Sequence, residues 1–232
     1  MKRFENKTIT SYKGPWWPRT IGSVELIGCT FRGCSIGFRR SKDFSRRTIV
    51  RNVYMRNCEI STCLLGPAQL EEITVENVQG DNLFVWGALF KHVRMRGRFD
   101  GIVIHGIPEL GMRGERQQRY WSLCNEYYAS CDWALDIREA EFADFSIRTR
   151  GIPAHLVRRD PETQAVVTKQ RIIEGKWRSL ELGKLVQTDF RLWENEGGED
   201  LIIVAPKGMK SDFIEVMADI RRLREAGIAE PN

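Results

Sequence analysis

Long apolar runs are missing from this 232-residue chain, and no stretch approaches the ~18 consecutive apolar residues that a membrane-spanning helix requires. The opening from Met1 to Lys7 is basic but leads into no apolar stretch, which argues against a secretory signal. We therefore expect a cytoplasmic protein without membrane contact, in which the six cysteines are reduced thiols.

A large excess of one charge is also missing. The chain has 36 Lys and Arg against 31 Asp and Glu, for a formal net charge of +5. This balance permits contact with nucleic acid or with an acidic protein but requires neither. Apolar residues make up 42% of the chain, enough for a core, so the composition predicts one large globular domain or two small ones.

From about residue 24, apolar residues recur every five positions, a period that fits neither a helix nor a strand. Smaller apolar residues recur at Val24, Cys29 and Cys34, and a larger one follows two positions behind each. A chain that directs two residues inward and then turns, every five residues, winds a square coil of roughly 20 residues, with coils stacked ~4.8 Å apart. The larger members and the later repeats are Leu26, Phe31, Ile36, Val53, Met55, Cys58, Ile60, Cys63, Leu65, Ala68, Leu70, Ile73, Val75, Leu83, Val85, Ala88, Phe90, Val93, Met95, Leu135, Ile137, Ala140, Phe142, Phe145 and Ile147.

This pattern resembles the pentapeptide-repeat family, most clearly in Cys58-Glu59-Ile60, Cys63-Leu64-Leu65 and Ala68-Gln69-Leu70. The resemblance implies a right-handed parallel β-helix with four sides. β-branched residues replace Leu and Phe at many positions and the array is interrupted, so a looser three-sided β-helix stays open. The predicted fold class is mainly β, with an inserted helix and a mixed α/β C-terminal capping region.

The cysteine spacing locates a loop. Cys29 and Cys58 are 29 residues apart, as are Cys34 and Cys63, so removing one coil of ~20 residues leaves about nine residues within 38–48. That segment is polar and basic, as a protruding loop should be. Arginines there can bind phosphates or carboxylates, and aromatic residues can stack on bases. The candidate binding residues are Arg39, Arg40, Lys42, Phe44, Arg46, Arg47 and Arg51.

The remaining segments are assigned as caps and insertions. Residues 1–20, with Pro15-Trp16-Trp17-Pro18, are an expected N-terminal cap on a solenoid spanning 21–150. Residues 105–133 carry a helical spacing of apolar residues and predict an insertion on its flank. In 151–232 we expect a hairpin over 154–169, one late coil through Leu180, Leu185 and Phe190, a buried strand at 201–204, and a helix from Ser211 to Gly227 that closes the solenoid.

Catalytic and metal chemistry finds weak support. Four thiols, from Cys29, Cys34, Cys58 and Cys63, suit zinc in number, but their spacing of five is not that of a zinc knuckle, so packed thiols are the preferred interpretation. Of three histidines, His105 lies near Asp100 in sequence, but nothing in the spacing brings an acid, a base and a nucleophile together. We expect no cofactor and no metal.

The favoured function is a non-enzymatic scaffold that presents a rigid β-solenoid and its basic loop to a protein partner with an acidic surface. One alternative is nucleic-acid binding through the loop and the arginines at 94–98. Others are a structural subunit of a larger assembly, such as a phage or secretion particle, and an enzyme acting on an outer face of the β-helix.

Overall fold

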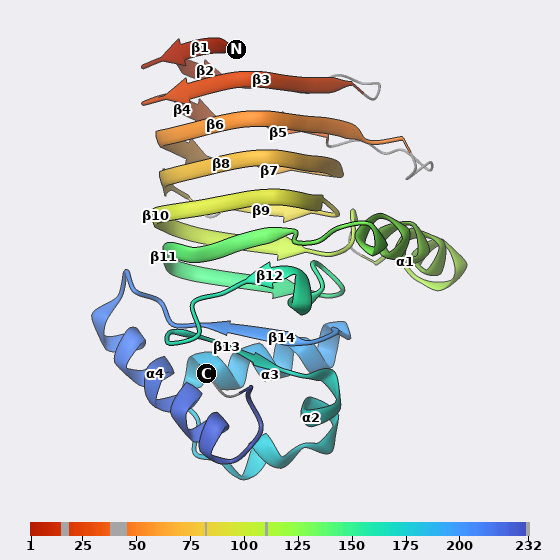
Figure 1. Cartoon of the computed structure of the whole chain (residues 1–232), viewed down its shortest axis with the longest axis vertical. Helices are drawn as coiled ribbons and strands as arrows, with labels where there is room; N and C mark the ends of the chain where they lie inside the picture. The colour runs from red at the N-terminus through yellow and green to blue at the C-terminus, as the bar shows by residue number, and fades with distance from the viewer. Residues whose placement is uncertain (15–18, 38–45, 82, 110, 231–232) are drawn as a thin grey trace.

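The computed structural model describes residues 1–14, 19–37, 46–81, 83–109 and 111–230, and the chain is mainly β (Figure 1). Its main feature is a large parallel sheet that curls through 237°. Eight strands follow one path, in the order β1 (Lys2–Glu5), β3 (Thr20–Ile27), β6 (Thr48–Ser61), β8 (Ala68–Gly80), β10 (Leu89–His105), β9 (Leu83–Trp86), β7 (Leu64–Leu65) and β5 (Ser35–Ile36). Strands β2 (Thr8–Thr10), β4 (Thr30–Arg32), β11 (Leu135–Arg148) and β12 (Val157–Arg158) join the same sheet.

The strand register has the predicted period. Val50 pairs with Leu70 and Leu70 with Phe90, so successive layers are 20 residues apart. Val24 pairs with Val53, which is 29 residues away, so this layer is nine residues longer than the others. The extra residues lie between β5 and β6, where the cysteine spacing places the loop. Cys29 accordingly stacks on Cys58, whose neighbour Glu59 donates a backbone hydrogen bond to the Cys29 carbonyl.

Corners with left-handed backbone explain the period of five. Asn52, Asn57 and Thr62 have φ angles of 53°, 53° and 54°, and Glu72 and Asn77 repeat the turn one layer on. Each such residue directly precedes an inward-facing one, so the chain changes direction at every fifth position. Asparagine tolerates this conformation better than most residues because its short polar side chain can hydrogen-bond locally.

The expected N-terminal cap continues the sheet. Phe4 pairs with Leu26 and Ile9 with Phe31, so β1 and β2 form an additional layer. Lys2 stands opposite Val24 of the next layer. Because a lysine occupies a position that is apolar in that layer, the sequence pattern did not reveal this first repeat. A lysine on the terminal strand blunts an edge that would otherwise pair with other chains. Residues 15–18 of the predicted cap lie outside the described residues.

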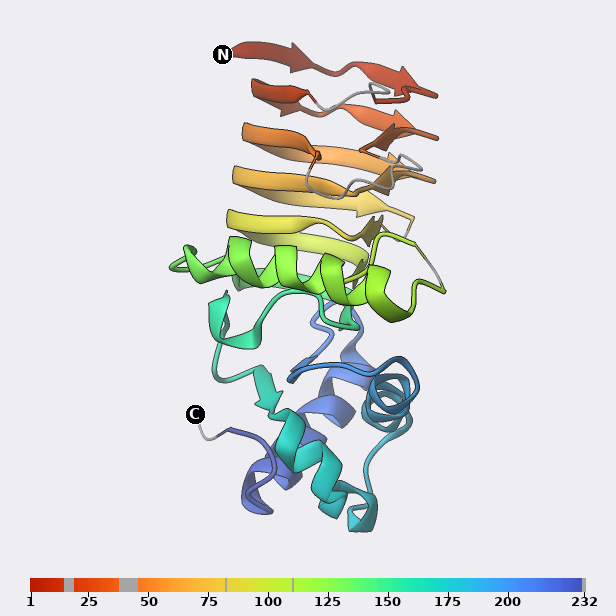
Figure 2. The ribbon, with the colours of Figure 1, turned by 90° about the vertical axis from the view of Figure 1, so that its right-hand side faces the viewer.

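The predicted insertion is confirmed as α1 (Gly114–Ala129), which crosses the flank of the sheet (Figure 2). It interrupts the passage from β10 to β11, where Val93 pairs with Leu135. In the part of the chain that the structure covers, no helix combines the length and the apolar character needed to cross a membrane.

The predicted hairpin over 154–169 is wrong. After η1 (Ala154–Leu156), Val157 pairs in parallel with Leu135 of the curled sheet, whereas β13 (Gln164–Val167) pairs antiparallel with β14 (Leu201–Val204). The two apolar triplets have the composition of hairpin strands, but each has a partner far away in sequence. The strand predicted at 201–204 is confirmed.

The predicted late coil through Leu180, Leu185 and Phe190 is also wrong. This region forms α2 (Lys169–Glu174), η2 (Lys176–Ser179) and α3 (Lys184–Glu196). Val186 and Phe190, four residues apart, are fully buried on one face of α3, so a helical spacing prevails over the apparent spacing of five.

The two-stranded sheet closes the end of the curled sheet. Val166 and Ile202 pack into the core of the curled sheet, while Val167 and Ile203 pack into a second core with α3 and α4 (Lys210–Glu225). Alternate side chains of a strand point to opposite faces, which lets β13 and β14 serve both cores. The predicted C-terminal helix is therefore confirmed as α4. The end of the curled sheet, however, is closed by β13 and β14 and not by this helix.

Candidate functional site

The candidate binding surface lies where α1 meets the end of the basic segment. Tyr120, Cys124 and Tyr128 repeat every four residues and bury one face of α1 against the sheet. The Tyr120 hydroxyl donates to the Gly87 carbonyl at 3.0 Å, and the Phe90 amide donates to the Tyr128 oxygen at 3.3 Å. Burial raises the pKa of both tyrosines, so both hydroxyls stay neutral. Tyr120 as a donor and Tyr128 as an acceptor then hold α1 in place.

Arg47 fastens the basic segment to this helix. Its Nη1 donates to the Gly87 carbonyl at 2.8 Å, and its guanidinium lies 4.9 Å from the centre of the Tyr120 ring. Its Nη2 is 3.9 Å from the Cys124 sulfur. The side chain is only 7% exposed. We expected Arg47 to contact a partner, but its burial gives it an anchoring position inside the protein.

The other predicted binding residues separate into two groups. Arg46 and Arg51 are exposed. Arg51 stands opposite Glu71 in the sheet, and Glu71 accepts a hydrogen bond from the Tyr127 hydroxyl of α1 at 3.3 Å. The remaining predicted residues, Arg39, Arg40, Lys42 and Phe44, lie outside the described residues.

Two further exposed arginines, one at the N-cap of α1 and one within the helix, escaped the sequence analysis. Arg113 and Arg119 are exposed at the start and in the first half of α1. Among the described residues, no carboxylate forms an ion pair with either of them, nor with Arg46 or Arg51. We call these four residues the basic surface. The helical spacing of 105–133 was visible in the sequence, but the exposed side of that helix could be assigned only once its buried side was known.

Within the described part of the chain, the arginines of β10, unlike those of the basic surface, are paired with acidic residues. Arg94 lies 3.6 Å from Asp136, Arg96 3.3 Å from Glu139, and Arg98 3.7 Å from Glu141. The acids belong to β11, which pairs with β10. This neutralised ladder is poorly suited to binding phosphates, which is the role that the nucleic-acid hypothesis assigned to the arginines at 94–98.

A histidine clamped between two acids is a polar cluster that sequence reasoning missed. Nδ1 of His92 is 2.5 Å from a Glu72 oxygen, and Nε2 is 2.6 Å from an Asp132 oxygen. Burial alone would lower the pKa of His92, but the two hydrogen bonds raise it above its ordinary value. Glu72 and His92 are one 20-residue layer apart, which is the signal that could have paired them. Both ring nitrogens are engaged, so this imidazole links Glu72 and Asp132 at the corner.

The catalytic hypothesis for His105 finds no supporting geometry. Its ring stacks on Trp86 at 3.9 Å with an interplanar angle of 5°. Burial, together with the nearby positive charge of Arg148, lowers the pKa of His105 to about 4. Within the described ranges, no hydrogen bond or ion pair joins its side chain to Asp100, the acid near it in sequence. The neutral ring is part of a packed stack at the end of β10.

A partly buried carboxyl, that of Asp189, occupies the junction between β11 and α3. Burial and the nearby charge of Asp144 raise the pKa of Asp189 to about 7, although Arg148 opposes the shift. Asp189 lines a small hollow of about 20 Å³ together with Arg148 and Trp193. The space is too small for a substrate, so Asp189 is a titrating structural group.

The four predicted packed thiols are buried and hydrogen-bonded to backbone carbonyls. The sulfur of Cys29 is 3.5 Å from the Phe4 oxygen, and that of Cys58 is 3.5 Å from the Leu26 oxygen. Burial raises the pKa of Cys58, which disfavours the thiolate that a metal needs. Across the described residues, no group of three or more His, Cys, Asp or Glu side chains is arranged to hold a metal ion.

Comparison of the chain with protein-family models, with curated proteins and with solved structures finds no match.

Proposed function

We propose that this chain is a non-enzymatic scaffold that binds an acidic protein through the basic surface and the basic segment that ends at Arg46. The observation that carries the proposal is the burial of Arg47 against Gly87 and Tyr120. This contact ties the end of the segment to α1, so Arg46 and Arg119, which adjoin Arg47 and Tyr120 in sequence, belong to one surface. A rigid framework lowers the entropic cost of binding because the cations are ordered in advance.

The charge distribution favours a protein over a nucleic acid. The cations of the basic surface have no ion-pair partner among the described residues, whereas each β10 arginine is already paired. Arginine binds carboxylates through two parallel hydrogen bonds, which suits an acidic protein surface. Affinity for nucleic acid instead grows with the number of phosphates that cations neutralise, and the paired β10 arginines are poorly suited to add such contacts.

The test is capture of a partner from lysate, with and without nuclease, by the parent and by two charge-reversed variants. One variant carries R46E, R113E and R119E. Its matched control carries K184E, K210E and R221E, which reverse the same charge at exposed positions of the C-terminal helices. We expect a stoichiometric protein that survives nuclease, binds the control and is lost with the first variant. Recovery that depends on nucleic acid, or equal capture by both variants, would reject the proposal.

We also propose that the curled sheet is a right-handed β-helix of the pentapeptide-repeat type. The support is the 20-residue register together with left-handed corners at Asn52, Asn57 and Thr62. Such a solenoid would supply the flat, stiff face on which α1 lies. An experimental electron-density map is the test: four continuous sides wound right-handed are expected, and an open sheet would contradict the assignment.

A further inference from the structure

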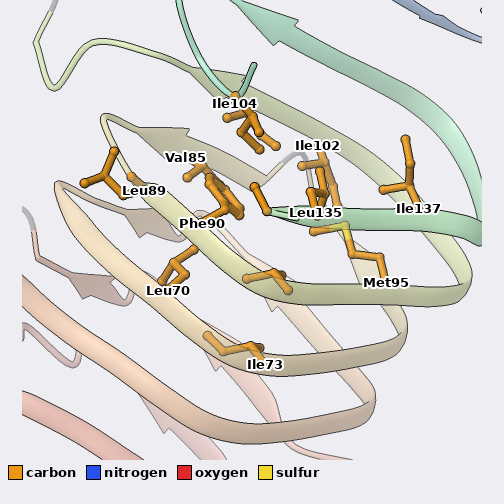
Figure 3. Close-up of a cluster of buried hydrophobic side chains, with 14 of the residues drawn as sticks. Leu70, Ile73, Val85, Leu89, Phe90, Met95, Ile102, Ile104, Leu135 and Ile137 are labelled. Carbon is orange, nitrogen blue, oxygen red and sulfur yellow. The ribbon is translucent and has the colours of Figure 1, made fainter. Parts of the chain in front are cut away.

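The interior of the curled sheet is not filled. A cavity of about 250 Å³ runs inside it, walled almost entirely by apolar side chains. Figure 3 shows a cluster of buried apolar side chains inside the sheet, of which Leu70, Val85 and Phe90 line this cavity. Apolar cavities of ~150 Å³ stay dry and take up small hydrocarbons, so this larger space is of ligand size.

The sequence explains why the cavity exists. Along one inner column the side chains are Leu26, Met55, Val75 and Met95, and the short Val75 stands between two longer methionines. Along another column, Gly80 follows Ile60 and supplies no side chain. A Cβ atom at Gly80 would lie 1.9 Å from the Ile60 carbonyl oxygen, so that position must remain empty.

The cavity reaches the surface beside Gly80. Asp81 and Asp100 line it and are exposed, and Leu64, also in its wall, is 36% exposed. Asp100 accepts a hydrogen bond from the Gly80 amide at 2.6 Å, and Asp81 accepts one from the Ser61 hydroxyl at 2.6 Å. Among the described residues, no cation forms an ion pair with either carboxylate. The opening is therefore negatively charged and the interior is apolar.

We propose that this cavity binds a linear aliphatic chain that carries a cationic amine head group. The wall extends from β3 to β10, which is three strand spacings or ~14 Å, and this length suits an extended alkyl chain. The two carboxylates at the opening attract an ammonium group and repel the carboxylate of a fatty acid. The site lies inside the sheet and is independent of the basic surface on its flank.

Calorimetric titration of the full chain with hexyl-, octyl- and decylammonium tests the proposal. Each buried methylene should tighten binding ~4-fold, or ~15-fold per pair, until the cavity is full. Decanol should bind more weakly than decylammonium, and decanoate more weakly still. Absence of saturable binding, affinity independent of chain length, or decanoate binding as tightly as decylammonium would each overturn the assignment.

Two variants separate the apolar interior from the charged opening. V75F fills the cavity and should abolish binding of all three amines, whereas I214F, at a position of α4 that is 60% exposed, should leave binding unchanged. The double variant D81N/D100N should bind decanol and decylammonium with equal affinity, and this result stands even if V75F does not fold. Retained binding in a folded V75F, or an unchanged preference for the amine in D81N/D100N, would contradict the site.

Discussion

Arg47 and Tyr120 donate hydrogen bonds to the same acceptor, the carbonyl oxygen of Gly87, at 2.8 Å and 3.0 Å. The two residues are 73 positions apart in the chain, and a third segment supplies the oxygen. The guanidinium also lies 4.9 Å from the centre of the tyrosine ring. One carbonyl therefore joins the basic segment, the inserted helix and the curled sheet.

Replacing Arg47 with Ala should destabilise the protein by about 2–3 kcal/mol, because a buried charge-assisted hydrogen bond and a cation–π contact are lost together. R46A, one residue away and exposed, should change the free energy of unfolding by less than about 0.5 kcal/mol. Urea unfolding of the two variants measures the difference. Equal stability would show that the Arg47 contacts do not hold the segment.

Gly33 has a strained backbone alone, whereas Gly80 combines backbone strain with steric overlap. Gly33 has a φ of 60° with nothing within 4 Å of an added Cβ, whereas Gly80 has a φ of 128° and an added Cβ would lie 1.9 Å from the Ile60 oxygen. We expect G33A to cost about 1 kcal/mol, the ordinary price of a left-handed alanine. G80A should cost several times more, because two backbone segments must move apart. Thermal unfolding of both variants decides this, and similar melting temperatures would be the contrary result.

His92 should contribute stability that depends on pH. Its folded pKa is raised by Asp132 and Glu72, so its contribution is fully present below the unfolded value of ~6.5 and is lost as pH rises through the folded pKa. The matched variant is H92N, because Asn52 already occupies the equivalent left-handed corner. The difference in unfolding free energy between parent and H92N should be largest below pH ~6.5 and should shrink as pH rises through the raised folded pKa. A constant difference would show that the clamp is not ionic.

Asp189 should also make stability fall as pH rises, but over a lower pH range than His92. Its pKa is raised to about 7 in the folded protein and is ~3.9 when unfolded, so the folded state binds a proton that the unfolded state releases. The parent should therefore lose stability as pH rises from about 4 to about 7. D189N removes this loss, and D144N should reduce it by removing a like charge. Unfolding curves across that range provide the measurement, and parallel pH profiles for parent and D189N would refute the assignment.

Much of the fold could be predicted from the sequence because its repeat depends on residues only five positions apart. The left-handed corners at Asn52 and Asn57 redirect the chain within five residues, so the layers could be counted from the sequence and the insertion between Cys29 and Cys58 could be measured. The hairpin over 154–169 failed for the converse reason. Val157 and Val166 each pair with a strand that local pattern cannot identify.

The candidate sites were less predictable than the fold. The sequence showed a cluster of arginines around 39–51 but not which side chain turns inward, and burial of Arg47 depends on an acceptor at Gly87 and a ring at Tyr120. The pairing of β10 arginines with β11 acids likewise appears only when the two strands are adjacent.

The sequence by itself determined the 20-residue layer, the stacked thiols, the inserted helix and the last strand and helix. These features depend on residue types at fixed short spacings, which set backbone direction and the side that is buried. The tertiary structure alone decided the anchoring of Arg47, the neutralised arginine ladder, the closure by β13 and β14, and the cavity beside Gly80. Each of these is a contact or a void between segments distant in sequence, and its energy depends on the geometry that brings those segments together.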